Sequence, residues 1–66
     1  MKIDRNKINL AMARQKMNQT DLANRSGLKR QAVSVILTRG TCTTVNAGRL
    51  AEALGVDIRE IVKEED

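Results

Sequence analysis

One short stretch of the chain, residues 29–35, combines polar side chains and an apolar one at helical spacing. The side chains concerned are those of Lys29, Arg30, Gln31, Ser34 and Val35. Arginine can donate two hydrogen bonds to a guanine edge, glutamine can pair with adenine, and an apolar side chain can contact the thymine methyl group. Gln31 and Val35 are four residues apart, so on a helix they share one face. These residues are candidates for reading DNA bases; the alternative is an ordinary solvated helix face with one exposed valine.

The composition leaves little room for catalysis or for a metal site. The chain has 66 residues, with one Cys and no His, Phe, Trp or Tyr. Without histidine it lacks the commonest general base and metal ligand. Cys42 alone can build neither a metal site nor a disulfide framework, and we interpret it as an incidental loop thiol. We therefore expect no enzyme, no metal and no cofactor.

Charge is distributed unevenly along the chain. Residues 1–49 carry ten basic and two acidic residues, a net charge of +8, whereas residues 50–66 carry two basic and six acidic residues, a net charge of −4. The chain as a whole has a net charge of +4. Such an asymmetry favours a polyanionic partner. The simpler interpretation is that lysine and arginine keep the helices soluble.

No targeting or membrane segment is recognisable. Residues 1–7 lack the apolar stretch of a signal peptide, and no apolar run approaches the roughly 20 residues that a spanning helix needs. With one unpaired Cys and no export signal, we expect a cytoplasmic protein, associated with the nucleoid if DNA is its partner.

The spacing of apolar residues predicts five short helices. They cover residues 4–16, 19–26, 30–38, 44–54 and 57–63. Asp4, and Thr43 or Thr44, are suitable N-caps. Gly27, Gly40 and Gly55 stand where the second, third and fourth helices would end. Together these elements predict an all-α fold, a compact five-helix bundle forming a single domain over residues 1–66.

The same spacing predicts the core. The residues expected to face inward are Ile8, Ala11, Met12, Gln15, Met17, Leu22, Ala23, Ser26, Leu28, Val33, Ile36, Leu37, Ala47, Leu50, Ala51, Leu54, Ile58, Ile61 and Val62. Gly48 is the awkward residue, because a glycine inside a helix costs about 1 kcal/mol relative to alanine. We expect it to allow close packing against a neighbouring helix.

Residues 19–38 have the features of a helix-turn-helix. Ala23 is small enough for two helices to cross closely, and Gly27 allows a tight turn after which Leu28 returns to the core. Val33 and Ile36 would anchor the second of these helices from below. The residues left on its solvated face are Arg30, Gln31, Ser34, Val35 and Thr38.

This pattern resembles the phage repressor/Cro family of helix-turn-helix DNA-binding domains over nearly the whole chain. The shared features are Gln19, Leu22-Ala23, Gly27, Ala32-Val33-Ser34, Ile36 and the segment Leu50-Ala51-Glu52-Ala53-Leu54-Gly55-Val56. Their joint spacing is more specific than any one of them. The resemblance implies a lambda-repressor-like fold whose third helix enters the major groove while the second crosses the DNA backbone. It assigns base reading to Lys29, Arg30, Gln31, Ser34 and Val35.

The resemblance also implies phosphate contacts. The residues concerned are Gln19, Thr20, Thr38, Arg39, Thr43, Thr44 and Asn46. Gln19 opens the second helix, where the family has a phosphate-contacting glutamine. Thr43, Thr44 and Asn46 are more simply explained as helix caps, although a helix N-terminus can bind phosphate as well. Arg39 is equally a phosphate contact or a loop charge.

The chain departs from the family in two places: at one pair of positions, and in the loop over residues 38–42 after the third helix, which is one residue longer before its glycine than is usual in the family. The family usually has an Arg near position 12 that pairs with a Glu near position 37, whereas this chain has Met12 and Leu37. An apolar pair can replace a buried ion pair with little loss of stability, so helix 1 should still be held to helix 3. In the family such an arginine often also contacts a DNA phosphate, and with Met12 in its place we do not expect that contact here.

The function that these features predict is a small sequence-specific regulator that binds double-stranded DNA. By resemblance it would repress by occupying a palindromic operator as a homodimer, formed in solution or only on DNA, with dimer contacts in residues 58–66. No small-molecule ligand is evident. The alternative is an antitoxin-like protein whose main partner is another protein, which exposure of Ile61 or Val62 would favour. An RNA-binding domain is disfavoured because aromatic residues are missing.

Overall fold

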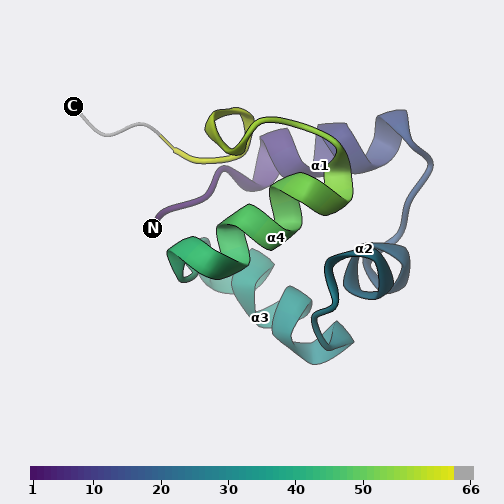
Figure 1. The fold of residues 1–66 in the computed structure, drawn as a ribbon, viewed down its shortest axis with the longest axis horizontal. Helices are drawn as coiled ribbons and strands as arrows, with labels where there is room; N and C mark the ends of the chain where they lie inside the picture. The colour runs from purple at the N-terminus through teal and green to yellow at the C-terminus, as the bar shows by residue number, and fades with distance from the viewer. Residues whose placement is uncertain (64–66) are drawn as a thin grey trace.

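Four α-helices and one turn of 3-10 helix make up residues 1–63, the part of the chain that this computed structural model describes. The elements are α1 (Arg5–Arg14), α2 (Gln19–Ser26), α3 (Arg30–Arg39), α4 (Thr44–Leu54) and η1 (Ile58–Glu60). In Figure 1, α4 lies in front of α1, α2 is seen nearly end-on, and α3 forms the lower edge. The helix α2 packs against both α3 and α4, and α4 packs against η1. The predicted all-helical fold is confirmed for residues 1–63.

The predicted fifth helix over residues 57–63 is wrong. Asp57 does start a helical turn, because its carboxylate accepts the Arg59 amide at 2.8 Å while Glu60 accepts the Asp57 amide at 3.0 Å. The turn ends at Glu60, since the backbone beyond it pairs with the start of the chain instead. The Asp4 amide donates to the Ile61 carbonyl at 2.7 Å, and the Lys63 amide donates to the Lys2 carbonyl at 3.0 Å. The fold is therefore a four-helix domain, not a five-helix bundle.

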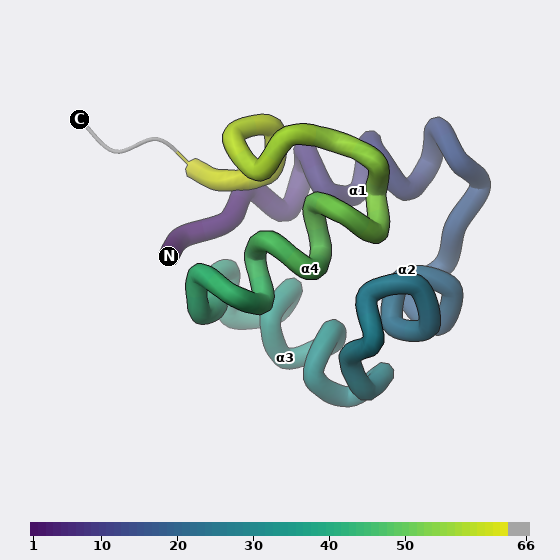
Figure 2. Tube along the Cα trace, viewed as in Figure 1, coloured from purple at the N-terminus to yellow at the C-terminus, as the bar shows by residue number. Residues whose placement is uncertain are grey.

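The first four residues form a segment that the helical spacing did not predict. It lies between residues 40–42 and residues 61–63, and Figure 2 shows the two ends of the described chain side by side. Two isolated antiparallel bridges, Lys2 with Thr41 and Ile3 with Val62, hold it there. Ile3 is only 3% exposed and joins the core. The segment thus connects the end of α3 to the end of the described chain.

The helix boundaries agree closely with the sequence, and the first helix shows why small shifts occur. Asp4 caps α1 by accepting the Asn6 and Lys7 amides. The helix ends at Arg14, earlier than predicted, because the Met17 amide turns back to the Met12 carbonyl at 2.9 Å and Lys16 adopts a positive φ of 54°. Helix α2 begins at Gln19 as predicted, but its cap is Asn18, which exchanges hydrogen bonds with Asp21.

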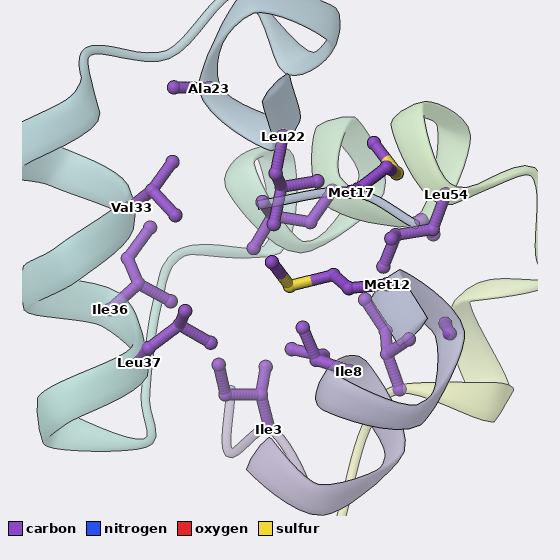
Figure 3. Packing of buried hydrophobic residues seen from close by; sticks show 14 residues of the cluster. Ile3, Ile8, Met12, Met17, Leu22, Ala23, Val33, Ile36, Leu37 and Leu54 are labelled. Carbon is purple, nitrogen blue, oxygen red and sulfur yellow. The ribbon is translucent and has the colours of Figure 1, made fainter. Parts of the chain in front are cut away.

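A single apolar cluster fills the space between the helices (Figure 3). Its largest fully buried side chains are Ile8, Leu22, Val33, Leu50, Leu54 and Ile61. Met12 and Leu37 both belong to it, each 7% exposed, so the apolar replacement for the family's ion pair is buried. Ile58 and Val62 are half-buried against the cluster.

Gln15 is the one residue predicted to face inward that stays exposed. Its side chain still holds elements together, because its amide nitrogen donates to the Leu54 carbonyl at the end of α4 and its oxygen accepts from Arg25 of α2. These contacts place Gln15 at the edge of the core, between α2 and the end of α4.

Within residues 1–63 no helix is both long enough and apolar enough to cross a bilayer; the longest of them, α4, has 11 residues.

The expectation that Gly48 allows close helix packing is also wrong. A Cβ atom added at Gly48 would meet nothing within 4 Å. Gly27 is different, because its φ of +75° lies in the left-handed region that ends α2 and begins the turn to α3. The left-handed backbone conformation thus requires glycine at position 27, whereas position 48 has room for a side chain.

We therefore expect opposite effects from the same substitution at these two positions. Gly48→Ala should raise the free energy of unfolding by about 0.5–1 kcal/mol, because alanine is the better helix former. Gly27→Ala should lower it by about 1–2 kcal/mol, because a Cβ is strained in the left-handed region. Urea unfolding followed by far-UV circular dichroism measures both. A loss of stability in Gly48→Ala would contradict the assignment of open space at that site.

Candidate nucleic-acid interface

The turn between α2 and α3 is fixed by hydrogen bonds to one carbonyl. The amides of Gly27 and Leu28 both point to the Ala23 carbonyl, the Leu28 nitrogen at 3.2 Å. The buried Ser26 hydroxyl donates to the same carbonyl at 3.1 Å and accepts the Leu28 amide at 3.3 Å. Leu28 is half-buried against the core. These contacts set the angle at which α3 leaves α2, which determines how α3 is presented to solvent.

Helix α3 has one buried and one exposed side. Val33, Ile36 and Leu37 are buried, and Gln31 and Val35 are exposed on the other side. Val35 is 40% exposed, so its apolar side chain is accessible to a partner. Ser34 is half-buried beside them, while Lys29 and Arg30 are exposed at the start of the helix. All five predicted base-reading residues thus lie on accessible parts of α3 or its cap; that they read bases stays a prediction.

The N-terminus of α3 is built differently from those of the other three α-helices. Side chains of Asp4, Asn18 and Thr43 cap α1, α2 and α4, but the Lys29 side chain makes no capping hydrogen bond. The first amides of α3 are therefore left without a side-chain acceptor. Lys29 and Arg30 also place positive charge at the positive end of the helix dipole, which is unfavourable in isolation. A bound anion would satisfy the amides and offset the charge.

A surface hollow joins three helices beside this face. We name it the central hollow, and its lining residues are Arg5, Asn6, Asn9, Gln19, Ser34, Leu37 and Thr38. It brings together three of the predicted contacts from different helices, Gln19 at the start of α2 with Ser34 and Thr38 of α3. Sequence reasoning missed the contribution of α1. The available signal was Arg5 and Asn9, two polar residues four apart on one helix face.

The other predicted phosphate contacts are more scattered. Thr20 is exposed in the first turn of α2, and Arg39 is exposed at the last residue of α3. Thr43 caps α4 by accepting the Asn46 amide at 3.1 Å, so its capping role is confirmed. Thr44 is exposed and Asn46 is half-buried next to this cap. None of these five lines the central hollow.

The chemistry of Cys42 agrees with an inert thiol. Burial raises the pKa of its thiol above the ordinary value, and the nearby N-terminal ammonium opposes this only in part. A raised pKa means less of the reactive thiolate near neutral pH. Within residues 1–63 no group of three or more His, Cys, Asp or Glu side chains is placed to hold a metal ion.

The fold recurs in a solved structure. The chain is similar over 100% of its length to part of native PhpD with cadmium atoms, with a TM-score of 0.82 and 26% sequence identity. It spans 14% of the length of that chain. No curated protein matches the sequence.

The family is shown by the sequence together with this geometry. A family model for the Cro/C1-type HTH DNA-binding domain matches residues 7–66, nearly the whole chain. That range contains all four helices except the first two residues of α1. The buried side of α3, the Gly27 turn and the capped start of α2 are the features described above for residues 18–39. The chain therefore belongs to the Cro/C1-type helix-turn-helix DNA-binding domain family.

Proposed function

We propose that this chain is a sequence-specific regulator that binds a palindromic operator as a homodimer and represses by occupying it. The observation that carries the proposal is the exposed side of α3: by helical spacing Gln31 and Val35 share it with Ser34 and Thr38, which line the central hollow together with Gln19. Base-reading chemistry and a backbone-contact residue thus occur on adjoining surfaces. Occupancy of an operator requires neither catalysis nor a cofactor.

In this proposal α3 enters the major groove and α2 crosses the backbone. Gln31 and Val35 contact base edges, and Arg30 contacts a base or a flanking phosphate. Lys29, the N-cap residue of α3, and the half-buried Ser34 are proposed to read bases together with them. Gln19 holds the domain on the backbone from the N-terminus of α2, assisted by Thr20 and Thr38. Arg39, Thr43, Thr44 and Asn46 are proposed to contact phosphates from the segment between α3 and α4. A duplex DNA partner would place the protein in the cytoplasm at the nucleoid.

We expect binding to duplex DNA to weaken strongly with salt, because phosphate neutralisation by the basic residues 1–49 would dominate the affinity. Six to ten phosphate contacts lower affinity about 10³- to 10⁵-fold between about 50 and 200 mM salt. Fluorescence anisotropy titrations across this range measure the slope. A flat response, or no duplex binding at the lowest salt, would refute the DNA assignment.

Substitutions on α3 and α2 should separate base reading from backbone contact. Once random-site selection has given a preferred duplex, Gln31→Ala should cost about 1–3 kcal/mol on that site and far less on a scrambled one. Val35→Ala should reduce selectivity for a thymine without changing the salt slope. Gln19→Ala should weaken binding to both duplexes by similar factors.

Asn24→Ala provides the matched control, since Asn24 is exposed on α2 and lines none of the hollows described here. It should leave both affinities unchanged. Far-UV circular dichroism checks that all variants fold, as expected for side chains that are exposed or half-buried. Equal weakening of both duplexes by Gln31→Ala would show that Gln31 does not read sequence.

The proposed homodimer is supported by one exposed surface. Leu10 is 64% exposed in an outer hollow formed by α1 and the segment around η1. Its lining residues are Lys7, Leu10, Ala11, Arg14, Val56, Glu60 and Ile61. This surface includes part of the range 58–66 in which dimer contacts are expected; residues 64–66 of that range lie outside the described residues.

Leu10→Ser should therefore weaken dimer formation on DNA. Analytical ultracentrifugation of duplex complexes should find two chains per duplex for the unaltered protein and a shift towards one for the variant. Val45→Ser is the control, because Val45 is similarly exposed, at 66%, but lies on α4 away from the outer hollow. One chain per duplex at saturation, with an asymmetric footprint, would refute the dimer.

The alternative of an antitoxin-like protein that binds DNA to autoregulate has less support. The feature expected to favour it was exposed apolar surface at Ile61 or Val62. Ile61 is fully buried and Val62 is half-buried against the core. A stable complex with a second protein through Leu10, with DNA stoichiometry unchanged in Leu10→Ser, would favour this alternative instead.

A further inference from the structure

A third hollow lies at the C-terminal end of α3, and its lining is strongly basic. It is bounded by residues 2–6, by residues 38–41 and by Lys63, and we name it the basic hollow. Four cationic residues line it: Lys2, Arg5, Arg39 and Lys63. Among residues 1–63, the only acidic residue in its lining is Asp4.

The backbone ladder of the N-terminal segment creates this hollow. The Ile3 amide donates to the Gly40 carbonyl at 3.0 Å, just after α3, and the Asp4 amide donates to Ile61 on the other side. Segments that are far apart in the sequence are thereby held next to one another, as Figure 2 shows for the first residues and residues 61–63. Arg5, Arg39 and Lys63 are brought to one place by hydrogen bonds between main-chain atoms, which do not depend on these side chains.

Three of the cations in the basic hollow, Arg5, Arg39 and Lys63, are not neutralised by carboxylates of residues 1–63. The Asp4 carboxylate is engaged at the start of α1, where it accepts the Asn6 amide at 3.0 Å and the Lys7 amide at 3.2 Å. Within residues 1–63 no carboxylate pairs with the side chains of Arg5, Arg39 or Lys63. Gathering like charges costs free energy unless an anion joins them.

The basic hollow is continuous with the proposed DNA surface. Arg5, Asn6 and Thr38 line both it and the central hollow, in which Gln19 and Ser34 lie. An anion in the basic hollow would therefore sit beside the backbone that Gln19 is proposed to contact. The anion that continues along such a surface is a further phosphate of the same duplex, to which guanidinium and ammonium groups bind with charge-assisted hydrogen bonds.

We propose that Arg5 and Lys63, together with Arg39, bind a backbone phosphate of the operator in the basic hollow. This inference rests on the proposed function and extends it: the first turn of α1 and the end of the described chain become part of the DNA-binding surface. The contact carries no base information, so it adds affinity equally on every sequence.

The test compares three variants that each remove one positive charge. Arg5→Gln and Lys63→Gln remove cations of the basic hollow. Lys16→Gln removes an exposed cation in the turn after α1, outside all three hollows. Affinity for the preferred and the scrambled duplex is measured at several salt concentrations, with thermal unfolding by circular dichroism as the folding control.

We expect Arg5→Gln and Lys63→Gln each to reduce the magnitude of the slope of log affinity against log salt measurably, by up to about 0.9, the value for complete loss of one phosphate contact. Both duplexes should weaken by the same factor. Lys16→Gln should leave the slope close to that of the unaltered protein. If all three variants behave alike, the charge acts only through the general field and the proposal is overturned.

A second measurement excludes a site for a small free anion. Amide chemical shifts of Asn6, Gly40 and Thr41 should follow a titration with duplex DNA and should show no saturable change with inorganic phosphate alone. Saturable shifts with inorganic phosphate, together with unchanged salt slopes in Arg5→Gln, would overturn the proposal in favour of a small anion. If only this inference is wrong, binding still depends on salt and Gln31→Ala still reduces it. If the unaltered protein binds no duplex at all, the proposed function is refuted as well.

Discussion

The burial of one side of α3 is the constraint on which the rest of the structure depends. Val33, Ile36 and Leu37 lie in the core, so the rotation of α3 about its axis is fixed. Burying a side chain of this size contributes about 1.5–3 kcal/mol, and the net stability of a small domain is only about 5–15 kcal/mol. Turning α3 to bury Gln31 and Val35 instead would remove much of that total. The exposure of these two residues is therefore a consequence of the core.

The second constraint is the hydrogen bonding of the N-terminal segment. Residues 1–4 satisfy main-chain groups of residues 40–42 and 61–63, and Ile3 contributes its side chain to the core. These contacts are the reason that the chain leaves the helical path after Glu60. They also place cations from both ends of the described chain beside the end of α3. The same backbone hydrogen bonds thus end the helical turn at Glu60 and bring together the cations of the basic hollow.

The distribution of positive charge lowers the stability of the DNA-free protein. Lys29 and Arg30 stand at a helix N-terminus that lacks a side-chain cap, and the basic hollow collects further positive charge. In the proposed complex a polyanion would supply both the missing acceptors and the opposite charge. Stability in the absence of DNA would then be exchanged for affinity in its presence. The apolar pair Met12 and Leu37 avoids a further buried charge in the core.

The sequence by itself determined the features that depend on local spacing. The four helices, the turn at Gly27 and the buried side of α3 follow from apolar periodicity, caps and one left-handed glycine, since these signals act between residues a few positions apart. The exposure of Gln31 and Val35 was predictable for the same reason. Only the tertiary structure decided the fate of residues 57–63, because their capping box starts a helix but distant backbone partners at residues 2–4 end it. It also decided that Gly48 faces open space and that Arg5, Arg39 and Lys63 share a hollow. Such contacts join residues far apart in the chain, and no local pattern records them.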